Sequence, residues 1–188
     1  MSVTEYLKWF EDHPGKMTDT YTHLGSSDAD TVAYGKHEYG TTAEDLRKFT
    51  AGETGSRGSK MFNEDALYRG KVFEAPNVYM TLRYLSKLTE PDNITSTYPI
   101  MEPDVYEALQ MASSVDHKLY FHKPVHIPVP GVRDQYITMQ GEVINELKSQ
   151  MVGNGELMRN YLSQVQHQLV CSGGDFALVS VLSRTGQL

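Results

Sequence analysis

The sequence predicts a mainly α-helical protein: a compact helical domain with an antiparallel helical hairpin, one or two short strands, and an extended polar N-terminal arm. Apolar side chains recur at helical spacing over most of residues 61–188, and a tight Gly-Asn-Gly turn at 153–155 separates two such segments. Over residues 16–60 aliphatic side chains are sparse, and Gly, Ser, Thr and Asp accumulate. We therefore divide the chain into residues 1–60, an N-terminal helix and arm, and residues 61–188, a compact mainly helical domain.

The N-terminal part is expected to contain two helices joined by polar chain. Residues 2–12 can form the first, because a Ser-x-x-Glu capping box precedes apolar side chains that share one face. A shorter helix follows Thr42, which suits an N-cap, and is closed by Gly52. A segment so poor in apolar side chains cannot build its own core. We expect the arm, residues 14–60, to be ordered by packing against other protein subunits.

Proline positions mark the first helices of the compact domain. Asn63 can cap one helix, and Pro76 stands where the next begins, which then ends at Glu90 and Pro91. Pro103 starts another helix, whose apolar side chains lie on one side. These signals predict three helices before the hairpin.

The last third of the chain contains the predicted hairpin and two extended segments. Residues 134–152 and 156–170 each place apolar side chains at helical spacing and form the hairpin. The segment 118–132 is expected to be extended, because its three prolines exclude a helix and suit an edge strand or a polyproline path. Residues 176–182, FALVSVL, are a strand or a final helix, and periodicity does not decide between them.

Composition excludes two classes of partner. The formal net charge is −7, from 24 acids and 17 bases without a basic cluster, so direct nucleic-acid binding is not expected. The longest apolar runs fall far short of the ~20 residues needed to cross a bilayer, so no membrane association is expected. One cysteine, Cys171, agrees with a reducing compartment, which predicts an intracellular protein, or a virion protein if the chain is viral.

The stretch GETGSRGSK, residues 52–60, has the composition of a phosphate-binding loop but not its pattern. A P-loop that begins at Gly52 requires glycine where Arg57 stands, and the order of Ser59 and Lys60 is reversed. No apolar strand precedes the loop. We interpret it as a mobile or partner-bound loop, and we expect no cofactor.

His117, His122 and His126 are the candidate metal ligands. In an extended segment the second and third point to the same side and could approach one ion. The spacing matches no standard zinc signature, however, and Lys118 and Lys123 lie among the histidines. We therefore expect no metal site, and interpret the histidines as partner contacts or as rings satisfied by the backbone.

Nucleophilic catalysis has one further candidate pair. Cys171 follows an apolar helix, and His167 lies four residues earlier on the same helical face. A catalytic cysteine normally uses a base held on a separate element. A buried, unreactive thiol is the favoured interpretation, and no catalytic residue is assigned.

These observations favour a structural protein over an enzyme. Twelve tyrosines provide contact area of the kind enriched at interfaces. The leading hypothesis is a structural subunit of a large assembly, of which a virion component of the capsid, neck or tail is the first example. Two alternatives remain: a small metal-binding or hydrolytic enzyme domain that uses the His117–His126 region, and a virus-encoded inhibitor that binds a host protein.

Overall fold

The chain folds into a mixed α/β structure. The computed structural model describes residues 23–35, 41–54, 64–100, 102–150 and 157–183. Within these residues the strands form a three-stranded sheet in the order β1-β4-β3 and a four-stranded sheet in the order β2-β5-β6-β7. The predicted mainly α-helical class is therefore wrong.

Both strands and helices occur in each half of the chain. The strands are β1 (Leu24–Gly25), β2 (Ile94–Thr97), β3 (Asp104–Tyr106), β4 (Met111–Ser113), β5 (His117–Pro128), β6 (Tyr136–Gln150) and β7 (Phe176–Ser183). The α-helices are α2 (Ala29–Tyr34), α3 (Ala43–Thr50), α4 (Glu64–Leu85) and α5 (Leu157–Ser172). Short 3-10 helices are η2 (Ser26–Asp28), η3 (Pro91–Asn93) and η4 (Glu107–Leu109).

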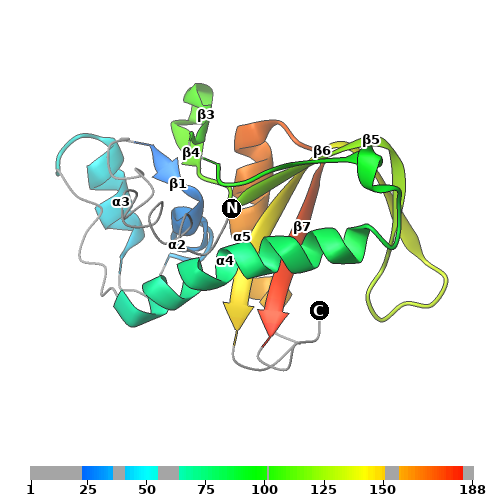
Figure 1. The fold of residues 1–188 in the computed structure, drawn as a ribbon. Coiled ribbons are helices and arrows are strands. Elements are labelled where there is room, and N and C mark those ends of the chain that lie inside the picture. The colour runs from blue at the N-terminus through cyan, green and yellow to red at the C-terminus, as the bar shows by residue number, and fades with distance from the viewer. Residues whose placement is uncertain (1–22, 36–40, 55–63, 101, 151–156, 184–188) are drawn as a thin grey trace.

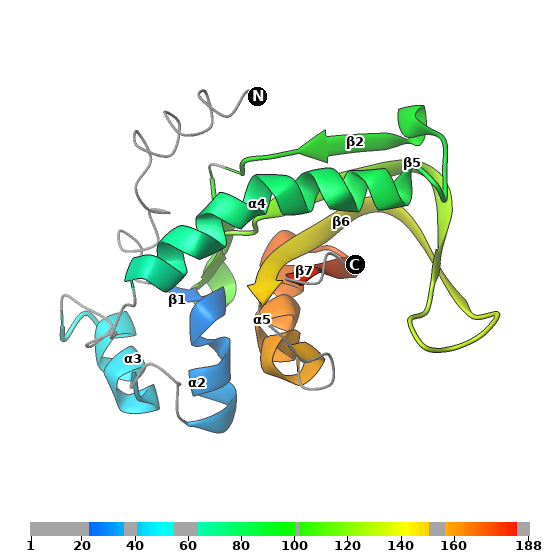
Figure 2. The same cartoon turned by 60° about the horizontal axis from the view of Figure 1, so that its bottom comes forward.

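The four-stranded sheet lies between two helices. In Figures 1 and 2, α4 crosses one face of the sheet and α5 lies against the other, and we call these the α4 face and the α5 face. Strand β5 is antiparallel to both β2 and β6, whereas β7 is parallel to β6. Parallel neighbours need a crossover connection, and α5 provides it between β6 and β7.

The main core lies between α4 and the sheet. Alternate positions of β5 point to the α4 face, where His117 is buried together with four apolar residues: Leu119, Phe121, Val125 and Ile127. They pack with Leu85 of α4 and with Met139 and Val143 of β6. Burial of each such side chain contributes roughly 1.5 to 3 kcal/mol before chain entropy is counted. The period of two along β5 thus builds one continuous apolar layer.

The predicted helical hairpin is only half present. Its second segment is a helix, α5, but residues 136–150 of its first segment form strand β6. Strand β6 is central and covered on both faces, so its apolar side chains do not alternate simply with polar ones. Val143 and Ile144 are adjacent in sequence, point to opposite faces, and are both fully buried. That pattern resembles helical spacing when read from the sequence alone.

Two other helix predictions are wrong. The helix expected after Pro103 is replaced by β3, η4 and β4. The two helices expected on either side of Pro76 are one helix, α4, with the proline in its interior. Pro76 is exposed, so its ring faces away from the sheet while the helix continues beneath it.

Strand β5 is extended as predicted but is a central strand rather than an edge strand. The β5–β6 register shifts between Phe121 and Val125, so Pro124 lies in an irregularity and need not donate to the ladder. The Asn93 side chain holds this irregularity. Its Oδ1 accepts from the Lys123 N–H at 2.6 Å, and its Nδ2 donates to the Lys123 carbonyl at 3.2 Å.

Part of the predicted arm packs against the rest of the protein. Helix α3 confirms the short helix after Thr42, whose Oγ1 accepts from the Asp45 N–H at 3.2 Å. Strand β1 pairs in parallel with β4, and α2 contacts α5. Thr31 of α2 is fully buried. The predicted helix at 2–12 lies outside the described residues.

In the part of the chain that the structure describes, none of the helices has the length and apolar character that a bilayer crossing requires.

Candidate functional site

A chain of polar side chains crosses the α4 face of the sheet. Registers place His117 of β5 opposite Asn145 of β6, with β2 and β7 on either side. Ser96 Oγ lies 2.9 Å from His117 Nε2, and Asn145 Nδ2 lies 2.9 Å from His117 Nδ1. Ser180 of β7 completes the chain, donating its hydroxyl to Asn145 Oδ1 at 2.6 Å. One hydrogen-bonded row therefore links all four strands.

His117 is neutral in this row. The residue has no exposed surface, and burial lowers the pKa of its imidazole to about 4, against an opposing effect of the Asp116 carboxylate. Because Asn145 Nδ2 donates to Nδ1, the ring proton is on Nε2 and is donated to the Ser96 hydroxyl. Nε2 then has no lone pair to accept the proton of Ser96. In this arrangement the histidine connects strands and does not act as a base.

The α5 face carries a separate buried ion pair. Lys148 Nζ lies 2.6 Å from Glu146 Oε1, and the Gln164 and Gln168 amides of α5 also donate to Glu146. Burial and the nearby Asp116 charge raise the pKa of Glu146, and Lys148 opposes this. Burial by itself disfavours the charged form of Lys148, but Glu146 and Asp116 raise its pKa overall. The pair joins β6 to α5.

A polar cavity of about 270 Å³ opens beside these groups, between α4 and the part of β6 that follows Asn145. Its lining residues are Gly70, Phe73, Glu74, Asn77, Asp116, Glu146, Leu147 and Lys148. Asn77 Nδ2 donates to the Lys148 and Ser180 carbonyls, while its Oδ1 has no hydrogen-bond partner among the described residues. The lining contains three carboxylates and the Asn77 Oδ1 atom, which are hydrogen-bond acceptors, and one cation, Lys148. A small molecule that donates hydrogen bonds would suit this lining.

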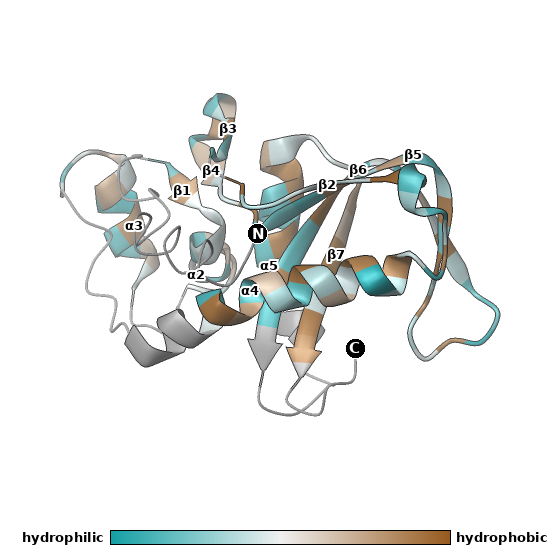
Figure 3. Ribbon diagram, in the orientation of Figure 1, coloured by the Kyte–Doolittle hydropathy of each residue, from teal (hydrophilic) through white to brown (hydrophobic). Residues whose placement is uncertain are grey.

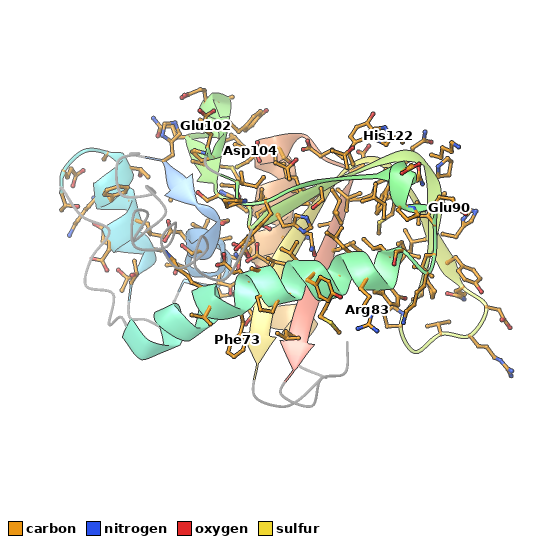
Figure 4. All side chains as sticks on the ribbon, in the orientation of Figure 1. Phe73, Arg83, Glu90, Glu102, Asp104 and His122 are labelled. Carbon is orange, nitrogen blue, oxygen red and sulfur yellow. The ribbon has the colours of Figure 1, made fainter. Side chains whose placement is uncertain are left out.

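The three candidate metal ligands are not brought together. His117 points to the α4 face, whereas His122 and His126 are exposed on the opposite face of β5. His122 Nε2 is 2.9 Å from Thr95 Oγ1, and His126 Nδ1 is 2.8 Å from Thr138 Oγ1. Figure 4 shows His122 on the side of the sheet away from α4. Within the described ranges, no group of three or more His, Cys, Asp or Glu side chains is arranged to hold a metal ion.

The other sequence candidates have simple structural roles or lie outside the described residues. Cys171 is buried, and burial raises the pKa of its thiol to about 11. His167 Nε2 is 3.1 Å from the Ala112 carbonyl, which ties α5 to β4. Most of the 52–60 loop, residues 55–60, lies outside the described part of the chain.

One feature that the sequence interpretation missed is the outer edge of β7. This strand is eight residues long, contains neither charge nor proline, and forms one end of the four-stranded sheet. Figure 1 shows no other strand beside its outer edge, and Figure 3 shows its largely apolar character. Residues 176–182 are all only partly buried, although helices cover both faces of the sheet. The uncharged run FALVSVLS is the available signal, but periodicity alone does not distinguish a strand from a helix there.

Comparison with known proteins adds no family to this geometry. No protein-family model matches the chain, and no curated protein or solved structure matches it. Function must therefore come from the residues and their arrangement.

Proposed function

We propose that the protein is a structural subunit of a larger protein assembly, and that it joins a neighbouring subunit through the outer edge of β7. The observation that carries this proposal is the outer edge of that strand, which is long and uncharged and pairs with no other strand among the described residues. Proteins that remain monomeric shield their sheet edges with charges, prolines, short strands or covering segments. An edge without these devices is suited to the addition of a strand from another chain.

The opposite edge of the same sheet provides an internal comparison. Strand β2 has only four residues, and Pro91 and Pro99 stand close to its two ends. Three of its four residues, Thr95, Ser96 and Thr97, are polar and exposed. This edge has the short strand and flanking prolines that β7, within Phe176–Ser183, lacks. The difference favours β7 as the edge that meets another chain.

Exposed aromatic side chains on α4 also support an assembly role. Phe73, Tyr79 and Tyr84 are 43%, 64% and 39% exposed, respectively. Figure 4 shows Phe73 and Arg83 on this helix. Aromatic residues and arginine are enriched where subunits meet. The identity of the assembly as a virion capsid, neck or tail component stays a prediction from the sequence, as does the role of the 14–60 arm in contacting other subunits.

The test compares two substitutions at one position. Val181→Pro removes a backbone N–H from the edge of β7, whereas Val181→Thr keeps that N–H and the β-branched shape. The full chain, isolated from its native source, is expected to migrate in a complex much heavier than one chain. Val181→Pro should release a folded single chain, and Val181→Thr should not. A wild-type protein that is recovered as a single chain would refute the assembly role.

A hydrolytic function is the second candidate, and the Ser96–His117–Asn145 row favours it. The order of hydroxyl, imidazole and amide is that of a nucleophile, a base and an orienting residue. It requires the Asn145 amide to be reversed, so that Oδ1 accepts from Nδ1–H and Nε2 is free to accept the Ser96 proton. A fluorophosphonate probe distinguishes the cases: stoichiometric labelling of the wild type but not of Ser96→Ala supports hydrolysis, and an unlabelled protein rejects it.

A further inference from the structure

We propose that the partner at the β7 edge is a second copy of this chain, with the two β7 strands antiparallel and centred on Ser180. The two four-stranded sheets then become one continuous sheet around a twofold axis. This inference rests on the proposed function, because it names the occupant of the same edge. Three independent features of β7 support it: the direction of its backbone groups, its side-chain order and the absence of charge along it.

The first feature is the direction of the backbone groups. Asn77 Nδ2 donates to the carbonyls of both Lys148 and Ser180, which places these two carbonyls in the space between β6 and β7. Backbone groups along a strand point alternately to its two sides. The N–H and C=O groups of Val179 and Val181 therefore point outward, away from β6. They are available to a new strand without loss of any bond to β6.

This alternation restricts the possible registers. In an antiparallel pair, residues whose groups point toward the partner must oppose one another to exchange both hydrogen bonds. Pairing centred on Ser180 places Val179 opposite Val181 of the second copy, so that outward groups meet outward groups. A slip by one residue would place backbone groups that point toward the second copy opposite groups that point toward β6. It would also bring side chains from opposite faces of the sheet into register.

The second feature is the order of side chains, which reads the same in both directions. Residues 178–182 are Leu-Val-Ser-Val-Leu, a palindrome about Ser180. In the proposed register Leu178 faces Leu182 and Val179 faces Val181, with the two serines opposed at the axis. A slip by two residues would instead oppose Leu178 and Ser180. Apolar cross-strand pairs stabilise a sheet, so the centred register is favoured over its neighbours.

The third feature is the absence of charge along the strand. Asp175 precedes β7, and Arg184 follows it, with no charged residue between them. None of the charged residues that give the chain its net charge of −7 thus lies in the strand that would meet its copy.

A cysteine scan tests the register directly. In a Cys171→Ala background, Ser180→Cys should form an intermolecular disulfide on mild oxidation, because opposed residues have Cβ atoms ~4.5–5.5 Å apart. Ala177→Cys is the matched control, because in this register the two positions lie six residues apart along the pair, about 20 Å, and cannot react. Rapid cross-linking at 180 but not at 177 supports the proposal. Equal cross-linking at both positions, or none at 180, overturns the register.

Sedimentation velocity of the purified full chain tests the partner. The expected result is a concentration-dependent dimer, with a dissociation constant that Val181→Pro raises more than tenfold and Val181→Thr changes little. Circular dichroism establishes that both variants are folded. A chain that remains monomeric when purified alone overturns self-pairing. Suppose that the purified chain is monomeric but the complex from the native source is lost with Val181→Pro. The assembly role then stands, with a different partner at this edge. If the native source yields no complex either, both proposals fail.

Discussion

Asn145 and His117 occupy opposed positions of β6 and β5, and Asn145 Nδ2 approaches His117 Nδ1 to 2.9 Å. The partner of this buried imidazole is an amide, not a carboxylate, so no charge is matched within the row. A neutral ring is therefore the form that the fold accommodates. Burial lowers the pKa of His117 to about 4, which likewise favours the neutral ring.

This preference predicts a loss of stability in mild acid. In the unfolded chain histidine has a pKa near ~6.5, so below that pH the unfolded state binds a proton that the folded state rejects. The free energy of unfolding should fall as the pH is lowered from about 6.5 to 4, by at most ~3 kcal/mol from this group. Urea unfolding at a series of pH values measures it.

The control for this prediction is His117→Gln, which lacks the titrating ring. Carboxylates titrate near the lower end of the same range in both proteins, so the difference between them isolates the histidine. The variant should be less stable at pH 7.5 and should lose less stability on acidification. Identical pH profiles for the two proteins would show that His117 does not titrate as proposed.

Breaking the ion pair on the α5 face should be costly. Lys148→Met leaves the Glu146 carboxylate buried without its cation, and we expect a loss of about 3 kcal/mol in unfolding free energy. Combining it with Glu146→Gln removes the stranded charge and should recover most of the loss. A double-mutant cycle in urea measures the coupling. Additive effects of the two substitutions would contradict the pairing.

Asn77 should contribute to stability through backbone contacts. Asn77→Leu keeps a similar volume but removes the donor to the Lys148 and Ser180 carbonyls. We expect a loss of ~1–3 kcal/mol, because two partly buried carbonyl acceptors lose a donor. Thr81, also buried on α4, provides a comparison: its Oγ1 has no hydrogen-bond partner in the described part of the chain, so Thr81→Val should cost little. Equal losses in the two variants would remove any special role for Asn77.

The single thiol should be unreactive in the folded protein. Burial raises the pKa of Cys171 to about 11, so little thiolate exists near pH 8, and the residue is only 8% exposed. An aromatic disulfide reagent should label it slowly under native conditions and fully in denaturant. Rapid native labelling would mean that α5 opens readily or that the thiol is accessible.

Some local signals predicted local structure, whereas the prolines at 76 and 103 did not mark helix starts. The cap at Thr42 and the extended segment around Pro124 were both identified from residues that act within a few positions of themselves. Strand β6 was misassigned because its burial depends on other elements: helices on both faces of the sheet bury Asn145 and Glu146 as well as the apolar residues on either side of them. A sequence pattern cannot show that polar residues are buried when their partners lie on other elements.

The candidate site was less predictable than the fold. His117 was identified, but its contacts with Ser96 and Asn145 depend on a register that joins β2, β5 and β6. The same register separates it from His122 by placing the two on opposite faces. The edge of β7 could be recognised only once Phe176–Ser183 was known to be a strand at the end of a sheet.

The pairing of β1 with β4 has a consequence for the order of folding. Leu24 lies opposite Met111, whereas β5 and β6 are joined by the short segment 129–135. The entropy lost in closing a loop grows with its length, so the β5–β6 hairpin can form early, and the contact made by β1 must await most of the chain. Only two residues of β1 pair with β4. We therefore expect this junction to assemble last and to exchange its amide hydrogens sooner than the central strands.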